Sequence, residues 1–269
     1  PGAVLFRLYD TYGFPLDLTA DIARERGLTI DRVGFDKEME RQRKLSKAAS
    51  QFVAATRVDL SDELATEFVG YKALKQAAAP ILNLLANNKS SVGELSEGEE
   101  GFIILAKTPF YAQGGGQIGD TGYLLNATSQ FLVTQTFKEG AFILHQGKLL
   151  KGHLKKGDKL KAEVDVEKRR AITLNHSATH LLHAALREVL GGHVMQKGSL
   201  VEPERLRFDF SHPDLLSTEQ LKIIEDRVNQ QIRANLPVLT QIMSREEARQ
   251  TGALAMFGEK YADKVRVLT

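Results

Sequence analysis

Two histidines four residues apart are the feature of the sequence best suited to chemistry. They lie in the segment Asn175-His176-Ser177-Ala178-Thr179-His180, and in a helix this spacing places both imidazoles on one face. His183 follows three residues later on the same face. Imidazole nitrogens placed in this way can hold one metal ion, and zinc is the usual one. The alternative is a set of solvated or core histidines, because zinc takes three or four protein ligands and the pair supplies two.

A glycine-rich segment, Gln113-Gly114-Gly115-Gly116-Gln117-Ile118-Gly119-Asp120, is the second candidate. Its glycines match the spacing of the dinucleotide-binding pattern G-x-G-x-x-G. In a dinucleotide site, however, that pattern follows a strand and begins a helix. Here Asp120-Thr121-Gly122 leads into another expected strand, so we reject a dinucleotide site. Glycines at this density let the backbone approach a ligand closely or adopt a positive φ. The alternative is a wide turn between barrel strands.

Charge and composition bound the class of protein. The formal net charge is only +2, but residues 148–170 carry nine Lys and Arg against four acidic residues. Such a stretch attracts phosphates, with RNA as one candidate partner, although it also fits a solvated face. The chain has no Cys and therefore no disulfide and no thiolate ligand of its own. No apolar run approaches the roughly 20 residues that span a bilayer.

The elements that position these residues fall into three stretches. Residues 1–60 have helical spacing, with Asp17 or Thr19 as the cap of a second helix that Gly27 ends, and with a third helix over about 35–52. Residues 61–166 contain short β-branched and aromatic runs between turn residues. This pattern predicts a small β-barrel that carries the glycine-rich segment.

Residues 167–269 alternate between helical and strand patterns. A helix over about 166–190 carries the histidine pair. Capping boxes at Ser217 and Ser244 open two further helices, and strands are expected at about 194–200, 205–210, 238–243 and 264–268. The predicted fold class is therefore multidomain α+β: an N-terminal helical segment, a small β-barrel, and a two-layer α/β core with an incomplete sheet.

The motifs, taken together and in order, resemble those of the bacterial alanyl-tRNA synthetases. Phe6-Arg7-Leu8-Tyr9-Asp10-Thr11-Tyr12-Gly13-Phe14-Pro15 looks like the end of the family's helical tRNA-recognition region. The others resemble its editing domain: Thr108-Pro109-Phe110-Tyr111 with the glycine-rich segment, the histidine segment, Gln196-Lys197-Gly198-Ser199, Arg207-Phe208-Asp209-Phe210-Ser211-His212 and Phe257-Gly258-Glu259-Lys260-Tyr261. The resemblance covers nearly the whole chain.

The resemblance implies roles for particular residues. It makes His176 and His180 two zinc ligands, and the family completes the site with a Cys and a His from a Cys-Gly-Gly-Thr-His segment that we expect beyond Thr269. It points to Gln196 and Thr179 as catalytic residues that position the substrate or water and shape the pocket. It suggests that tRNA is bound by Gly114, Gly115, Gly116, Gln117, Arg205 and Arg207.

The function implied by the resemblance is editing: hydrolysis of the ester that joins serine or glycine to tRNA(Ala). The implied partners are tRNA(Ala) and its misacylated forms, and the implied location is cytoplasmic. The sequence opens in mid-pattern, without Met, so we expect the ATP- and Mg-dependent aminoacylation domain before Pro1 and an oligomerising domain after Thr269. The alternative is a module that binds tRNA without hydrolysing it, because the zinc site would be incomplete.

Overall fold

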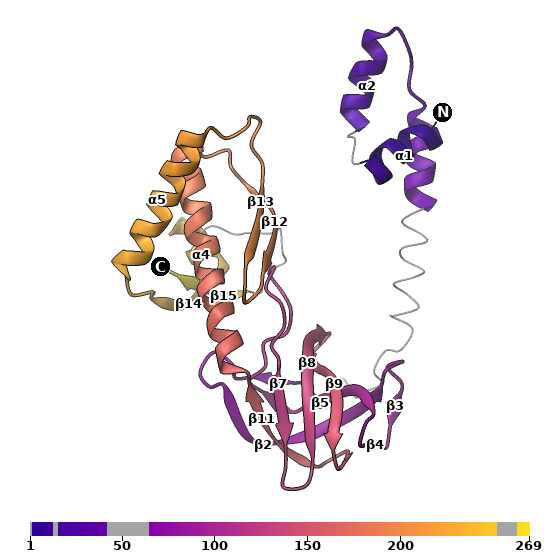
Figure 1. The fold of residues 1–269 in the computed structure, drawn as a ribbon, viewed down its shortest axis with the longest axis vertical. Helices are drawn as coiled ribbons and strands as arrows, with labels where there is room; N and C mark the ends of the chain where they lie inside the picture. Colours follow the sequence, from indigo (N-terminus) through magenta and orange to yellow (C-terminus); the bar gives the residue numbers. More distant parts are fainter. Residues whose placement is uncertain (1, 13–15, 42–64, 252–262) are drawn as a thin grey trace. The chain divides into compact units, whose positions relative to one another are not determined.

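The computed structural model describes residues 2–12, 16–41, 65–251 and 263–269 (Figure 1). The chain divides into two compact units, Pro1–Asp59 and Leu60–Thr269. Among the described residues, no helix is both long and apolar enough to span a membrane. The predicted multidomain α+β class is confirmed, since the first unit is helical and the second combines a closed barrel with helices and hairpins.

The first unit contains α1 (Gly2–Tyr12), α2 (Leu16–Glu25) and helical residues 32–41. Gly27 ends α2 as predicted, because it adopts a φ of 67° and its N–H donates to the carbonyl of Arg24. The capping prediction was wrong: α2 already begins at Leu16, so Asp17 and Thr19 lie inside the helix. Residues 32–41 are helical, in agreement with the first part of the predicted third helix, and residues 42–52 of that prediction lie outside the described residues.

Asp31 joins two helices of this unit. Its carboxylate accepts from the N–H of Gly34 at 2.8 Å, which caps the helix over 32–41, and from the N–H of Gly2 at 2.9 Å, at the start of α1. These two hydrogen bonds lower the pKa of Asp31. Buried Phe35 meets the Tyr9 ring edge-on, with the ring centroids 5.7 Å apart. Polar capping and aromatic packing thus hold the same pair of helices together.

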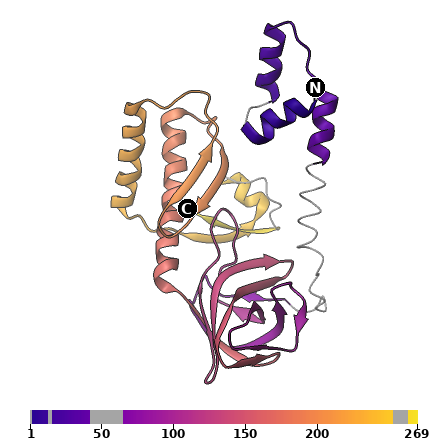
Figure 2. The ribbon, with the colours of Figure 1, turned by 45° about the vertical axis from the view of Figure 1, so that its right-hand side comes forward.

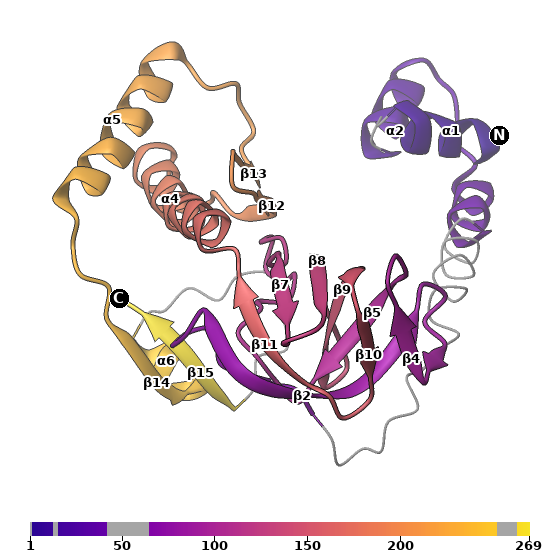
Figure 3. The ribbon, with the colours of Figure 1, turned by 60° about the horizontal axis from the view of Figure 1, so that its bottom comes forward.

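A closed barrel of six antiparallel strands begins the second unit and confirms the predicted barrel. Its order is β11-β7-β8-β9-β5-β2, and pairing of β11 with β2 closes it (Figure 3). The strands are β2 (Lys75–Ala86), β5 (Glu100–Leu105), β7 (Gly122–Leu125), β8 (Gln130–Glu139), β9 (Phe142–Lys151) and β11 (Lys159–Val164). Short strands flank it: β1 (Glu67–Phe68), β3 (Ser91–Val92), β4 (Glu94–Ser96), β6 (Lys107–Thr108) and β10 (His153–Lys155).

Period-two alternation fills the barrel with apolar side chains. The fully enclosed ones include Leu84, Ile103, Leu124, Phe131, Leu149 and Leu160. Each comes from a different strand, so the interior is a packed core, as expected of a small barrel. This rigid barrel presents the glycine-rich loop, which leaves β6 and enters β7.

The rest of the second unit is built on one long helix. This helix, α4 (Val166–Leu190), has the predicted bounds, and Asp165 caps it by accepting from the N–H of Lys168. The elements that follow are β12 (Gln196–Val201), β13 (Leu206–Phe210), α5 (Thr218–Ala234), β14 (Thr240–Ser244), α6 (Arg245–Gln250) and β15 (Lys264–Leu268). Both predicted capping boxes, at Ser217 and Ser244, form with their reciprocal hydrogen bonds.

Within the described residues, the strands that we expected to share one sheet in the last stretch form two separate hairpins. β12 pairs with β13, and β14 pairs with β15, as two separate antiparallel hairpins. α4 lies between α5 on one side and the β12–β13 hairpin on the other (Figure 2). Leu186, Val194 and Ile224 form the buried centre of that packing, which fixes the face of α4 turned away from solvent.

Candidate functional site

The tip of the glycine-rich loop is a tight turn that requires glycine. Gly114 and Gln117 exchange two backbone hydrogen bonds, of 3.1 Å and 3.0 Å. The two residues between them, Gly115 and Gly116, have φ values of 59° and 82°. Two consecutive positive φ angles are typical of a type I′ turn, which glycine adopts without steric cost. The chain then enters strand β7 at Gly122, so the strand expected after the loop is confirmed and the loop opens no helix.

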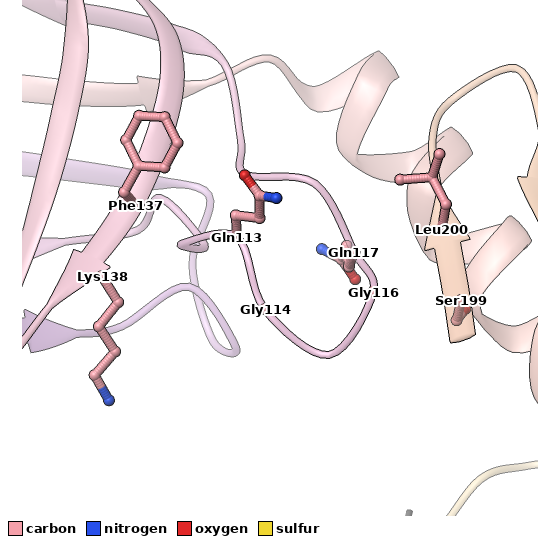
Figure 4. A pocket seen from close by; sticks show the side chains of 8 residues that line it. All are labelled: Gln113, Gly114, Gly116, Gln117, Phe137, Lys138, Ser199 and Leu200. Carbon is pink, nitrogen blue, oxygen red and sulfur yellow. The ribbon is translucent and has the colours of Figure 1, made fainter. Parts of the chain in front are cut away.

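The loop is held on both sides. On one side the N–H of Val201 donates to the carbonyl of Gly116 at 2.8 Å, which lays the turn along β12 (Figure 4). On the other, the N–H of Gln113 donates to the carbonyl of Thr136 on β8 at 2.9 Å. A Cβ on Gly119 would lie 2.2 Å from that same carbonyl oxygen, so this contact also requires glycine. The loop therefore joins the barrel to β12.

A buried ion pair joins the same loop to α4. Asp120 accepts from Arg169, with Nε 2.8 Å from Oδ1, and from the N–H of Tyr111 at 2.7 Å. The Arg169 guanidinium also donates to the carbonyls of Gly70 and Pro109. The Asp120 side chain is 1% exposed and the Arg169 side chain is 13% exposed. All polar atoms of the carboxylate and the guanidinium are hydrogen bonded. Arg169 was counted in the basic stretch expected to attract phosphates, but its burial in this pair removes it from that role.

The histidine pair meets the loop through Gln117. The rings of His176 and His180 stack with centroids 5.1 Å apart, one helical turn from each other. Nδ1 of His176 lies 2.7 Å from Oε1 of Gln117, a side chain only 7% exposed. Since an amide oxygen can only accept, this contact places the ring proton on Nδ1 and leaves Nε2 with a free lone pair. Two motifs 59 residues apart in sequence thus form one site.

Burial sets the charge state of the pair. Desolvation lowers the pKa of His176, with a further contribution from His180, and desolvation alone lowers the pKa of His180. Both rings are therefore favoured in the neutral form at neutral pH. A neutral imidazole is the form that binds a metal ion or accepts a proton.

The two imidazoles fit half of a zinc site. Their spacing and neutral charge suit two nitrogen ligands, and the Gln117 contact orients one of them as an outer-shell hydrogen bond would. Within residues 2–12, 16–41, 65–251 and 263–269, however, no group of three or more His, Asp or Glu is placed to hold a metal. These residues alone do not complete a zinc site, which needs three or four protein ligands.

Two neighbours of the pair have structural contacts. Asn175 donates through Nδ2 to the carbonyls of Glu202 and Pro203, at 2.8 Å and 3.0 Å, which ties the β12–β13 turn to α4. Thr179, a predicted catalytic residue, is 5% exposed, and its hydroxyl donates to the carbonyl of Asn175 one turn earlier. The structure thus places Thr179 beside the pair with its hydroxyl already engaged.

The other predicted site residues lie on the β12–β13 hairpin. Gln196 opens β12, is half-buried, and makes no side-chain hydrogen bond to a described residue. Arg205 is exposed and pairs with Glu202 at 2.8 Å, and Arg207 is exposed and pairs with Asp209 at 3.2 Å. No hydrogen bond in the described part of the chain links these three side chains to the histidine pair.

A pocket of about 460 Å³ lies beside the loop (Figure 4). Its lining comes from the loop, from the end of β8 and from β12: Gln113, Gly114, Gly116, Gln117, Phe137, Lys138, Ser199 and Leu200. Gln117 lines the pocket and also hydrogen bonds to His176, so it lies between the pocket and the histidine pair. No spacing rule relates the end of β8 to a distant loop, so the sequence alone does not predict that Phe137 and Lys138 line this pocket.

The two central glycines of the turn provide a matched pair of variants. Gly115→Ala is expected to destabilise the second unit by about 1–2 kcal/mol, because alanine must adopt a positive φ while no atom lies within 4 Å of the new Cβ. Gly116→Ala adds a contact of 2.8 Å with Cβ of Ser199, and we expect about 1–3 kcal/mol more. Urea midpoints of the two variants measure the difference. Equal midpoints would mean that the loop does not pack against β12.

Comparisons with known proteins show which family the chain resembles. The family model described as tRNA synthetases class II (A) matches residues 1–168. The alanine–tRNA ligase of Pseudomonas fluorescens is 54% identical over 269 residues, which is 100% of this chain and 30% of that protein. Those of Nitrosococcus oceani and Coxiella burnetii are 53% and 54% identical, again over the whole chain and 31% of each protein.

The chain thus spans about a third of the length of these curated relatives. The family model, by contrast, matches more than half of the chain itself. The chain therefore belongs to the tRNA synthetases class II (A), with alanine–tRNA ligases as its relatives.

Proposed function

We propose that this chain is the editing region of an alanyl-tRNA synthetase and that it hydrolyses the ester between serine or glycine and tRNA(Ala). The observation that carries the proposal is the hydrogen bond from His176 to Gln117. It joins a pair of neutral imidazoles to a loop that also lines a pocket. A site that hydrolyses an ester needs such a combination: a group that orients or activates the reacting atoms beside a space that holds the substrate.

The need for a second site follows from the chemistry of small side chains. A pocket made for alanine excludes glycine and serine poorly, because one small group changes binding by only about 1–3 kcal/mol. A separate hydrolytic site applies this difference in binding free energy a second time. A serine hydroxyl can be held by a polar partner there, and alanine leaves that partner without a hydrogen bond.

We assign His176 and His180 as two ligands of a zinc ion, with the remaining Cys and His ligands supplied by the family's Cys-Gly-Gly-Thr-His segment in the longer protein. Bound zinc polarises an ester carbonyl or activates water. Gln117 holds the His176 ring in its orientation. Gln196, whose amide is free of hydrogen bonds to described residues, positions substrate or water, and Thr179 shapes the space beside the pair.

The partners follow from the same assignment. The substrate is tRNA(Ala) misacylated with serine or glycine, held by the turn at Gly114, Gly115 and Gly116, where the Gly114 N–H is already donated to Gln117, and by the exposed Arg205 and Arg207. In the longer protein, attachment of alanine uses ATP and Mg²⁺ in a different region, and a C-terminal region forms the oligomer. Both of these activities are part of the proposal, since the chain spans about a third of its relatives.

The second candidate is a module that binds tRNA and hydrolyses nothing by itself. The observation in its favour is that the described residues bring together only two metal ligands. Two imidazoles without a thiolate bind zinc far more weakly than a complete set.

The test is hydrolysis of radiolabelled seryl-tRNA(Ala) and alanyl-tRNA(Ala) by this chain with added zinc. We expect the seryl ester to be cleaved and the alanyl ester to be spared, with activity lost in His176→Ala. The control is His153→Ala, which changes an exposed histidine on β10. If the chain is inactive, the same assay on a version extended through the Cys-Gly-Gly-Thr-His segment decides. Activity there supports editing with ligands supplied from that segment, and inactivity there rules editing out.

A further inference from the structure

We propose that His193 and His212 form a metal site of their own, which binds a divalent ion of the Cu²⁺ or Ni²⁺ class between the two imidazoles. His193 lies in the turn between α4 and β12, and His212 lies two residues after β13. Nε2 of His193 is 3.0 Å from Nδ1 of His212. The inference goes beyond the proposed function and does not rest on it, because these residues are separate from the pair His176–His180.

The seven histidines of the chain differ in what they offer a metal ion. His145 is enclosed in the barrel with both ring nitrogens hydrogen bonded, and His183 is only 6% exposed. His153 is exposed on β10, and no hydrogen bond or ring contact within the described residues joins it to another histidine. Apart from the pair already described, the structure therefore brings two accessible imidazoles together only at His193 and His212.

The backbone around the two rings is fixed by hydrogen bonds of its own. The N–H of Ser211, next to His212, donates to the carbonyl of Met195 at 3.0 Å. The N–H of Met195 donates in return to Oγ of Ser211 at 3.1 Å. Val194, next to His193, is completely buried. These contacts hold the two segments side by side independently of the imidazoles, so a metal ion meets two ligands that are already close.

The separation of the two nitrogens suits ligands at right angles around one ion. At metal–nitrogen distances of about 2.0–2.1 Å, neighbouring ligands of a square-planar or octahedral ion lie about 2.8–3.0 Å apart, and tetrahedral ligands about 3.3–3.4 Å apart. The 3.0 Å between Nε2 of His193 and Nδ1 of His212 matches the first range. Square-planar coordination by nitrogen and oxygen is typical of Cu²⁺ and Ni²⁺, which sets the class of metal.

The contact between the rings is a hydrogen bond that a metal ion would replace. One ring donates and the other accepts, with the ring centroids 5.2 Å apart. A metal ion needs a lone pair on both facing nitrogens, so the donating ring carries its proton on its other nitrogen when the ion binds, and neither ring changes its net charge. Since His193 is exposed and His212 half-buried, both rings can turn about their side-chain bonds until the lone pairs converge.

Water completes the coordination of the ion. Within residues 2–12, 16–41, 65–251 and 263–269, no third His, Asp or Glu is placed with this pair. Two protein ligands are too few for a structural zinc site, whereas a tetragonal ion accepts two imidazoles with water at its other positions. The usual order of stability for nitrogen ligands places Cu²⁺ above both Ni²⁺ and Zn²⁺. The Kd for Cu²⁺ is therefore expected to be lower than the Kd for Zn²⁺.

The test is titration of the chain with Cu²⁺ alone, measured by calorimetry and by electron paramagnetic resonance. We expect a bound Cu²⁺ whose spectrum shows hyperfine splitting from two imidazole nitrogens and which is retained in His176→Ala. His193→Gln and His212→Gln are expected to raise its Kd by about tenfold or more, because the second imidazole acts at a high effective concentration. Glutamine can still hydrogen bond to the remaining ring, which separates lost metal binding from lost structure.

The matched control is His153→Gln, which changes an exposed histidine on β10 and is expected to leave the Kd unchanged. Three outcomes overturn the inference. His193→Gln and His212→Gln could change the Kd no more than His153→Gln does, which would make the ion adventitious. The same ion could be lost in His176→Ala, which would place it at the other pair. Zn²⁺ could bind more tightly than Cu²⁺, which would contradict the class of metal. None of these outcomes affects the proposed function, which hydrolysis of seryl-tRNA(Ala) tests separately.

Discussion

Replacement of Arg169 by methionine is expected to destabilise the second unit by about 3–5 kcal/mol, because it leaves the carboxylate of Asp120 buried without its cation. Asp120 is 1% exposed and would retain only the N–H of Tyr111 among the contacts described above. The carbonyls of Gly70 and Pro109 would also lose their donor. Urea denaturation followed by far-UV circular dichroism measures the loss.

The design includes two comparisons. Arg170→Met changes the neighbouring exposed arginine and is expected to have an effect within about 0.5 kcal/mol. The double variant Asp120→Leu with Arg169→Met removes both charges and is expected to lose less than the sum of the single variants. Losses that add fully would show that the two side chains do not interact, and α4 would then be held to the loop by other contacts.

The largest pH effect is expected from His145, which is enclosed in the barrel. Its Nδ1 donates to the carbonyl of Ile103 at 2.8 Å, and its Nε2 accepts from the hydroxyl of Thr108 at 2.7 Å. Desolvation by burial lowers its pKa from 6.5 to about 4, against the weaker opposing effect of the hydrogen bond to Ile103. The folded chain therefore holds this ring neutral over a range in which the unfolded chain protonates it.

The sign of the effect follows from proton counting. In the unfolded state the His145 ring binds a proton below pH 6.5, whereas in the folded state it stays neutral down to about pH 4. The free energy of unfolding therefore falls as the pH is lowered through this window. The total loss is about 3 kcal/mol, complete below the folded pKa and absent above pH 7. His145→Gln keeps a donor and an acceptor but does not titrate. Between pH 7 and pH 4 its free energy of unfolding is therefore expected to fall by about 3 kcal/mol less than that of the unchanged chain. Parallel stability curves for the two proteins would contradict the assignment.

Local rules predicted the elements of the fold well. The bounds of α4, both capping boxes and the end of α2 at Gly27 follow from helix periodicity and from residues within one turn of each helix end. The barrel follows from short strands between turns. The cap of α2 failed because Asp17 and Thr19 are both good caps, yet the helix starts before either of them.

Contacts between residues far apart in the sequence could not be predicted. Asp120 and Arg169 are 49 residues apart, and Gln117 and His176 are 59 apart. Neither pairing follows from spacing, because the path of the barrel between them decides which residues meet. His145 gave no signal either: in sequence it is the last residue of an apolar run, and only closure of the barrel shows that it is enclosed. The motif Phe257-Gly258-Glu259-Lys260-Tyr261 lies outside the described residues.

Gln117 joins the glycine-rich loop and the histidine pair into the site to which we assign editing. The most direct measurement compares seryl-tRNA(Ala) hydrolysis by Gln117→Ala and Gln113→Ala, in the shortest version of the protein that is active. Both glutamines line the pocket, and only Gln117 contacts His176. We expect Gln117→Ala to lower kcat/KM by about 10–100-fold, as loss of the outer-shell partner of a metal-ligating histidine does, and Gln113→Ala to lower it far less. Equal effects of the two substitutions would contradict the account.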